Sequence, residues 1–406
     1  MLQATISYRA CEKIARTLGT IHSGLSHAPT ANTIQNWTLR RGLHELTRPK
    51  EQADDWILLV DHTIQLGNEK CLLIVGIRLE HWLNLDRPIR LSDLSAILIE
   101  IVQTSNGKIV AEQLKKAADR VGQVKAIISD QGSDLVNGIA GFQQESESTI
   151  ALTDMCHRTA TALKHVLQKD PQWDSFLGHC GKTQPKAKQT ELGSLLPPKL
   201  KVKARFMNLH SLIGWAERML RLLDTPHEER QQQDRLGRLE EKFAWVLDYR
   251  ESIAVWARLM RMVDKTLEHS RTVGFNADSA ASLAEKLSCD VGDWQSQAFR
   301  DEIVSAIEEN SSILAPGERL PASSEILESL IGKGKQMGRQ HSRSGFTRNV
   351  LSMAASVADV SAEAIETSLA SVTHKTLCNW VKDNLRQTMT MFRRSVLPSS
   401  PGTDTA

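Results

Sequence analysis

The sequence lacks the long apolar run that a membrane-spanning segment needs. No stretch of about 18 consecutive apolar residues occurs in its 406 residues, so no transmembrane helix is expected. Residues 1–16 also lack the apolar segment and the small-residue cleavage site of a signal peptide. These absences favour a cytoplasmic protein with no membrane partner, associated with the nucleoid if it binds DNA.

Paired cysteines are also missing. The chain has 6 cysteines, but none of them forms a C-x-x-C pair. Neither a zinc site of the usual spacing nor a disulfide framework is therefore expected. Reduced, buried thiols are the simplest interpretation of these residues.

The sequence has few aromatic residues and almost no net charge. Aromatics make up 5% of the chain and the formal net charge is +2, so the total charge does not indicate a nucleic-acid partner. Basic residues are nevertheless concentrated in 182–205 and 333–348. A solvated surface explains either run alone, but the two together suggest grooves for an anionic polymer. The DNA-contact candidates in these runs are Lys199, Lys201, Lys203, Arg205, Lys333, Lys335, Arg339 and Arg343.

The N-terminal segment, residues 1–50, has the pattern of two short helices separated by a turn. Arg9 to Leu18 has helical spacing, residues 24–29 contain Gly and Pro, and a second helical pattern begins at Thr33. A second helix with basic and amide side chains is typical of a helix-turn-helix. We therefore expect a DNA-binding segment here. Its contact candidates are Asn36, Arg40 and Arg41.

Residues 51–169 alternate between apolar runs of strand length and helical patterns. The order is strand, strand, strand, helix, strand, helix, strand, helix, which is the order of the ribonuclease-H-like fold. The expected strands are Trp56–Val60, Lys70–Ile77, Leu94–Val102, Val124–Ile128 and Thr149–Leu152, with a turn at Gly67–Asn68 and helices at Ile109–Val121, Leu135–Phe142 and Thr159–Leu167.

Helical patterns then dominate. Residues 170–313 predict a large all-α insertion into the α/β core, with its tryptophans as core anchors. Residues 314–396 return to the core and contain a helix from about Glu325, followed by helices at Val350–Val360 and Ala362–Trp380. Residues 397–406 are expected to form a loose tail.

Two acidic residues follow neighbouring apolar runs. Asp61 ends the first predicted strand and Asp130 follows the fourth. Strand ends in a mixed sheet can bring distant carboxylates together, where they repel each other unless a divalent cation lies between them. The sequence therefore predicts a carboxylate–metal site at this edge of the sheet.

Three segments resemble the three motifs of bacterial insertion-sequence DDE transposases. They are Asp61-His-Thr-Ile-Gln-Leu-Gly67, Ile128-Ser-Asp-Gln-Gly-Ser-Asp134 and Pro321-Ala-Ser-Ser-Glu-Ile-Leu-Glu-Ser-Leu330, which continues to Lys335. Asp154-Met-Cys-His157 is similar to the D-x-x-H signature of transposases with a helical insertion. Thr33–Trp37 and Pro197–Asn208 extend the resemblance over most of the chain.

The resemblance implies a catalytic triad of Asp61, Asp130 and Glu328, which would hold two Mg²⁺ ions, with Mn²⁺ as a substitute. Glu325, one turn earlier on the same helix, is the alternative third acid. Lys335 lies two turns after Glu328 on the same face, as a basic partner does in this family. The resemblance also gives supporting roles to Asp154 and His157.

The expected function is therefore DNA transposition. The enzyme would bind the ends of an element, cleave a phosphodiester to free a 3′-hydroxyl, and join that hydroxyl to target DNA. Double-stranded DNA would be its partner, and a homodimer or larger assembly on DNA is typical of the family. Two alternatives stay open: a non-catalytic DNA-binding protein derived from a transposase, and a ribonuclease-H-like nuclease that cuts without joining.

Two polar residues beside the acids are expected to be structural. His62 follows Asp61 and should point to the opposite face of the strand, which favours a packing or supporting contact over metal ligation. Asp134 lies one turn after Asp130 and is suited to capping the following helix.

Overall fold

The computed structural model describes residues 6–22, 27–64, 69–199, 209–225, 239–339, 347–385 and 396. The chain divides into two compact units, here called the core unit (1–154 with 323–406) and the helical unit (155–322). The predicted turn at Gly67–Asn68 and the predicted tail at 397–406 lie outside the described residues. The predicted insertion, 170–313, falls within the helical unit.

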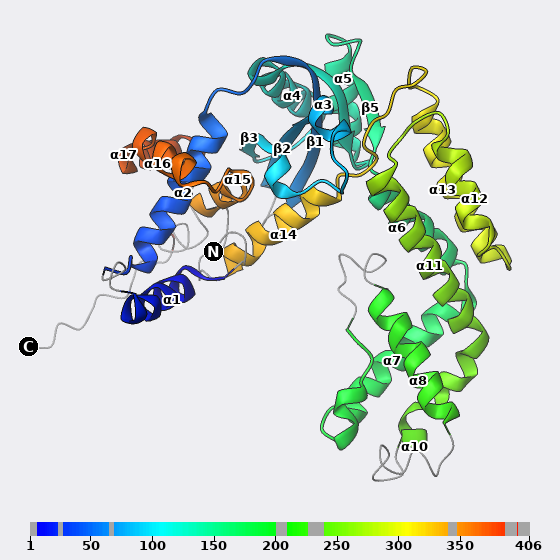
Figure 1. Ribbon diagram of the computed structural model, residues 1–406. Coiled ribbons are helices and arrows are strands. Elements are labelled where there is room, and N and C mark those ends of the chain that lie inside the picture. The colour runs from blue at the N-terminus through cyan, green and yellow to red at the C-terminus, as the bar shows by residue number, and fades with distance from the viewer. Residues whose placement is uncertain are drawn as a thin grey trace, which may run out of the picture. The chain divides into compact units, whose positions relative to one another are not determined.

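The core unit contains a five-stranded mixed sheet, so the protein is of the α/β class (Figure 1). The strand order is β3-β2-β1-β4-β5, with β1 in the centre. β1 pairs antiparallel with β2 and parallel with β4, and β4 pairs parallel with β5. The strands span β1 Ala53–Ile64, β2 Lys70–Arg78, β3 Ser95–Val102, β4 Gly122–Ser129 and β5 Ile150–Thr153.

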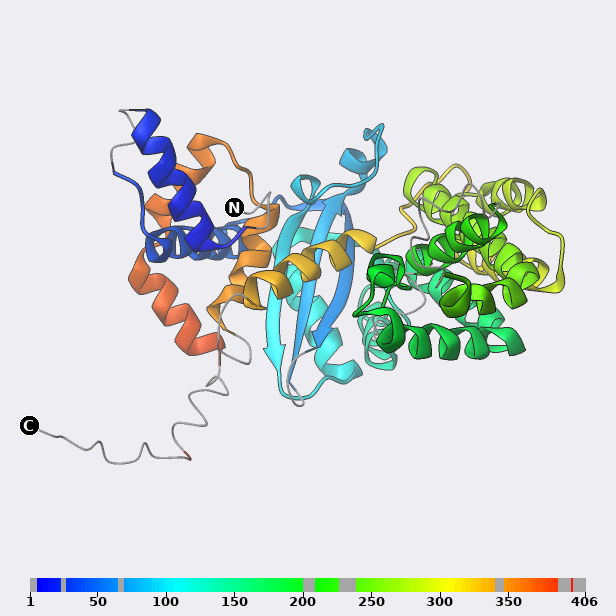
Figure 2. The ribbon, with the colours of Figure 1, turned by 90° about the horizontal axis from the view of Figure 1, so that it is seen from below.

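The alternation of side chains along β1 separates the two faces of the sheet. Trp56, Leu58 and Val60 pack in one core cluster with side chains of α4 (Gly107–Val121) and α5 (Ser133–Gln143). The intervening residues point to the other face, where α14 (Glu325–Arg339) crosses the sheet and contacts β1 (Figure 2). By this alternation Asp61 belongs to the α14 face and His62 to the α4–α5 face.

Helices from both ends of the chain pack together in the core unit. α2 makes its most extensive helix contacts with α15 and also contacts α1, α16 and α17. The N-terminal pair of helices is therefore joined to the C-terminal helices and does not stand alone. These helices are α1 Tyr8–Ile21, α2 Ala31–Thr47, α15 Leu351–Val357, α16 Ala362–Ser371 and α17 His374–Asn384, and the short α3 (Leu79–Leu83) follows β2.

The described residues of the helical unit form helices and one isolated bridge between Phe275 and Leu320. An aromatic cluster in its core joins Trp173, Phe176 and Trp256, whose ring centroids lie 5.0–6.2 Å apart. Its helices are α6 Met155–Gln168, α7 Pro171–Ala187, α8 His210–Asp224, α10 Leu239–Phe243, α11 Arg250–Thr272, α12 Ser279–Ser288 and α13 Trp294–Ser311. Tryptophans 215, 245 and 256 join this packing as expected, whereas Trp294 is half exposed.

No helix in the described part of the chain has both the length and the apolar composition needed to cross a membrane.

Candidate active site

Asp61 and Asp130 lie on adjacent parallel strands of the core unit. In the register of β1 and β4, Val60 is paired with Ser129, and each aspartate is the next residue along its chain. The side-by-side arrangement expected from the sequence is therefore present. The carboxyl of Asp130 is further held by the backbone N–H of Gly132, at 2.9 Å from Oδ1.

The electrostatics of Asp61 identify the carboxyl groups around it. Burial raises the pKa of Asp61 to about 7, and the charge of Asp130 acts in the same direction. Glu328 and Asp154 also raise this pKa, so carboxyl groups from β4, α14 and the end of β5 all act on Asp61. Glu328, rather than Glu325, is among these charges, which favours Glu328 as the third acid.

Asp154 fixes the start of the helix that holds Glu328. Its Oδ1 accepts the backbone N–H of Ser324 at 3.0 Å, in a buried contact just before α14 begins. Its own backbone N–H donates to the carbonyl of Ser129, at the end of β4. Asp154 therefore connects α14 to the strand that precedes Asp130. Its predicted companion His157 is exposed on α6, in the helical unit.

The donor set of the core unit fits a hard divalent cation. Asp61, Asp130 and Glu328 offer only carboxylate oxygens, which Mg²⁺ and Mn²⁺ prefer. Burial is the main cause of the raised pKa of Asp61, and repulsion from the neighbouring carboxylates adds to it; a bound cation would relieve that repulsion. As they stand, no three His, Cys, Asp or Glu side chains in the described ranges are close enough to hold one ion.

Replacing Asp61 with Asn is expected to stabilise the metal-free protein at about pH 8 by on the order of 2 kcal/mol. The pKa of Asp61 is about 7 in the folded protein and 3.8 in the unfolded chain. The neutral carboxyl therefore contributes its full stability to the fold below about pH 4. Wild type loses this contribution as the pH rises to about 7, whereas Asn stays neutral. Urea unfolding in EDTA at about pH 5 and 8 measures the difference. Asp54→Asn, exposed on the same strand, is the control, and equal pH profiles for all three proteins would contradict the expectation.

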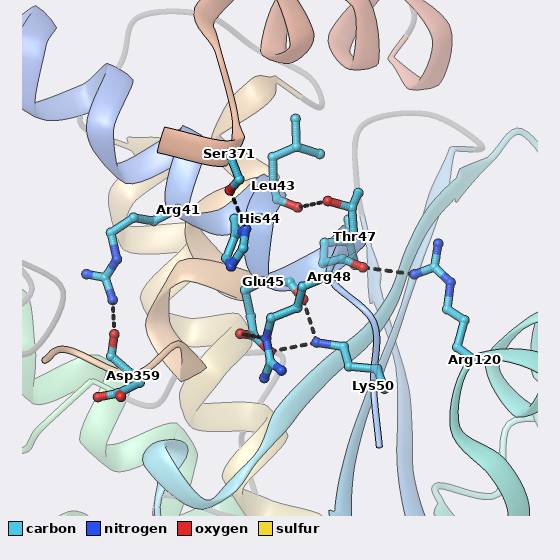
Figure 3. Close-up of polar contacts among 11 residues, drawn as sticks. Arg41, Leu43, His44, Glu45, Thr47, Arg48, Lys50, Arg120, Asp359 and Ser371 are labelled. Carbon is cyan, nitrogen blue, oxygen red and sulfur yellow. Dashed lines mark hydrogen bonds and ion pairs between the residues drawn. The ribbon is translucent and has the colours of Figure 1, made fainter. Parts of the chain in front are cut away.

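The two arginines predicted to contact DNA from α2 have partners inside the core unit. Arg40 donates to the carbonyls of Leu369 and Val372 at the C-terminal end of α16, where carbonyls without helical partners attract a cation. Arg41 is 9% exposed and donates to the carbonyl of Asp359 at 2.5 Å (Figure 3). Both guanidinium groups therefore fasten α2 to the C-terminal helices.

Polar side chains in the C-terminal half of α2 also have partners within the core unit. Glu45 binds both Arg48 and Lys50, and His44 meets the hydroxyl of Ser371 at 2.8 Å (Figure 3). Asn36, nearer the start of the helix, lies 3.1 Å from the ring of His374 on α17. These side chains therefore bind other residues of the core unit. We interpret them as packing contacts and not as a surface that faces a DNA groove.

The remaining basic candidates lie on the surface where they are described. Lys199 and Lys335 are exposed and Lys333 is half-buried. Arg339 ends α14, but its side chain is outside the described atoms. Lys201, Lys203, Arg205 and Arg343 lie outside the described residues.

A basic pocket that the sequence analysis missed lies between α1 and the start of α2. It has a volume of about 350 Å³ and is lined by Arg9, Glu12, Lys13, Arg16 and residues 30–32. Within the described part of the chain, Glu12 pairs with Arg16, whereas Arg9 and Lys13 have no ion-pair partner. The signal was present in the sequence, because positions 9, 13 and 16 share one face of a helix.

No protein-family model matches the chain, and no curated protein shows significant similarity to it.

Proposed function

We propose that the protein is a DDE-type DNA transposase with a ribonuclease-H-like core. The observation that carries the proposal is the register of the two parallel strands β1 and β4: Asp61 and Asp130 each come one residue after the paired Val60 and Ser129. The charges of Asp130 and of Glu328 on α14 both act to raise the pKa of Asp61, in addition to the effect of burial. The acids are far apart in sequence, and the register of β1 and β4 places Asp61 and Asp130 next to each other along the backbone. The strand order supports the fold assignment, because three antiparallel strands precede two parallel ones.

The proposed reaction has two steps at phosphorus. Hydrolysis of one phosphodiester frees a 3′-hydroxyl, and attack by that hydroxyl on a target phosphodiester forms the new bond as the target strand is released. Asp61, Asp130 and Glu328 would hold Mg²⁺ or Mn²⁺, which supplies charge stabilisation at the attacking and leaving oxygens. No side chain has to form a covalent bond to DNA.

The basic pocket supplies a surface for the substrate. Arg9 and Lys13 are exposed cations on one face of α1, close to Ala31 and Asn32 at the start of α2. The two exposed cations suit the phosphate backbone of duplex DNA, whereas the start of α2 is already occupied, because the Ala31 N–H donates to Glu12 Oε2 at 2.9 Å. We assign DNA contact to this face of α1 in place of Arg40 and Arg41.

Replacing both Arg9 and Lys13 with Gln is expected to reduce the salt dependence of DNA binding. Each phosphate contact contributes about 0.9 to the slope of log affinity against log salt, so the slope should fall by about 1.8. Fluorescence anisotropy with labelled duplex DNA across a salt series measures it. The matched control is Lys164→Gln with Lys169→Gln, two exposed lysines of the helical unit. An unchanged slope in the α1 variant would remove this face from the DNA-binding surface.

Nicking of supercoiled plasmid in Mn²⁺ tests the proposed activity. The wild type should nick, whereas EDTA or Asp61→Asn should prevent it. Mapping the 3′ end into a second duplex then separates transposition from cleavage alone. Nicking without joining would indicate the ribonuclease-H-like nuclease. DNA binding with no cleavage on any substrate would indicate the non-catalytic derivative.

A further inference from the structure

Four polar side chains from four segments of the core unit meet behind the acidic site. Asp134 of α5 accepts a hydrogen bond from Lys70 Nζ of β2, with 2.8 Å between Nζ and Oδ2. The same Oδ2 lies 3.7 Å from Nδ1 of His62 on β1. The other ring nitrogen of His62 lies 3.2 Å from the hydroxyl of Ser105, just before α4. We call His62, Lys70, Ser105 and Asp134 the anchor cluster.

Two members of the anchor cluster, His62 and Asp134, are largely shielded from solvent, whereas Lys70 is 39% exposed. The side chains of His62 and Asp134 are 8% and 15% exposed. Burial acts to raise the pKa of Asp134, but hydrogen bonds from Lys70 and Ser105 hold it at about 2. Asp134 is therefore a permanent anion at neutral pH, with donors from β2 and from the loop that precedes α4.

The cluster has a direct connection to Asp61. His62 is the next residue on β1, and its side chain is held on the α4–α5 face while Asp61 points to the α14 face. A backbone hydrogen bond from His62 also acts on the Asp61 carboxyl and favours its charged form. Fixing the His62 side chain thus fixes the peptide that donates to Asp61.

A second connection leads to Asp130. Asp130 and Asp134 flank a short turn whose Gly132 N–H donates to Asp130 Oδ1. A Cβ at Gly132 would lie 3.0 Å from Asp130 Oδ1 and 3.3 Å from Asp134 Oδ1, so both carboxyl groups close on this glycine. Holding Asp134 in place therefore restricts the turn that carries Asp130.

We propose that Asp134, through His62 and Ser105, is a positioning residue that holds Asp61 and Asp130 in register for a divalent cation. This inference rests on the proposed function, because it assumes that the two aspartates are ligands. Asp134 acts through its neighbours and belongs to the shell of groups that orients the ligands. Loss of such groups typically weakens metal binding or activity by about 10- to 100-fold.

The test compares Asp134→Asn, Ser105→Ala and His62→Gln with wild type and with Asp119→Asn, an exposed acid on α4. Mn²⁺ affinity is measured by EPR of the free ion, together with thermal unfolding and plasmid nicking at saturating Mn²⁺. We expect Asp134→Asn to weaken Mn²⁺ binding by about 10- to 100-fold while the protein is still folded. Ser105→Ala should weaken it less, His62→Gln should partly preserve it, and Asp119→Asn should leave it unchanged.

Each of the other possible results would contradict a different part of the proposal. If Asp134→Asn lowers the unfolding temperature but keeps the wild-type Mn²⁺ affinity, the cluster is structural only. If Asp134→Asn weakens binding while Ser105→Ala has no effect, Asp134 is itself a ligand and the positioning role is wrong. If wild type neither binds Mn²⁺ nor nicks DNA, the proposed function fails and this inference fails with it.

Discussion

Replacement of Glu328 by Gln is expected to lower Mn²⁺-dependent nicking by at least about a thousandfold, which corresponds to roughly 4 kcal/mol of transition-state stabilisation. The substitution keeps the size of the side chain and its place on α14 but removes the carboxylate charge that acts on Asp61. Nicking rates at saturating Mn²⁺ measure the effect.

Glu325 supplies a matched control on the same helix. It is the first residue of α14, where a carboxylate stabilises the helix N-terminus by a few tenths of a kcal/mol. Glu325→Gln should therefore keep nicking within about threefold of wild type. The pair differs only in which turn of α14 loses its charge, so general damage to the helix would affect both variants.

The opposite outcome is equally informative. If Glu325→Gln abolishes nicking while Glu328→Gln keeps it, the third acid lies one turn earlier than the electrostatics of Asp61 indicate. If both variants nick as wild type does, α14 contributes no acid to the reaction and the DDE assignment fails.

Replacing Gly42 with Ala is expected to destabilise the core unit by about 3 kcal/mol, because a buried backbone contact leaves no space for a methyl group. A Cβ at position 42 would lie 1.9 Å from the carbonyl oxygen of Leu351 and 2.8 Å from its carbonyl carbon. These are backbone atoms at the start of α15, so α2 and α15 would have to separate.

Gly332 provides the matched substitution in the same unit. It also lies inside a helix, α14, but a Cβ there has no neighbour within 4 Å. Gly332→Ala should therefore gain the usual helix preference for alanine and stabilise by about 0.5–1 kcal/mol. Urea unfolding followed by hydrogen exchange in β1 and α2 compares the two free energies.

The sign of the effect is the decisive readout. If both variants are more stable than wild type, the distance between α2 and α15 at Gly42 must be large enough to accept a methyl group, contrary to the structure. A loss at Gly42 together with a gain at Gly332 identifies close helix packing as the cause.

Local patterns of apolar residues in the sequence correctly predicted the strands of the core sheet. The predicted strand at Lys70–Ile77 is β2, Lys70–Arg78, and each of the other four apolar runs also became a strand. The prediction worked because a strand buried on both faces has a continuous apolar run that ends where polar residues begin. Asp130 follows β4 as expected, whereas Asp61 lies inside β1, because that strand continues to Ile64 beyond its apolar run. The role of the two residues as metal ligands stays a prediction.

Helix boundaries were less accurate where packing overrides the local signal. The predicted helix Ala362–Trp380 is divided into α16 and α17, because Thr373 caps a new helix. Pro185 lies inside α7, close to its C-terminal end. Because a proline there removes one hydrogen bond to the carbonyl four residues earlier, it is normally a signal that a helix has ended.

The sequence by itself determined the α/β class, the order of the strands along the chain and the acidic residues that follow the apolar runs, because these depend on residues close together in the chain. The tertiary structure decided which charges meet. Arg40 and Arg41 bind backbone carbonyls more than three hundred residues away, which no local pattern could predict. Among the described residues, Arg9 and Lys13 have no ion-pair partner and line the pocket beside α2. The resemblance already favoured Glu328 over Glu325, and the structure adds that Glu328 is among the charges that act on Asp61.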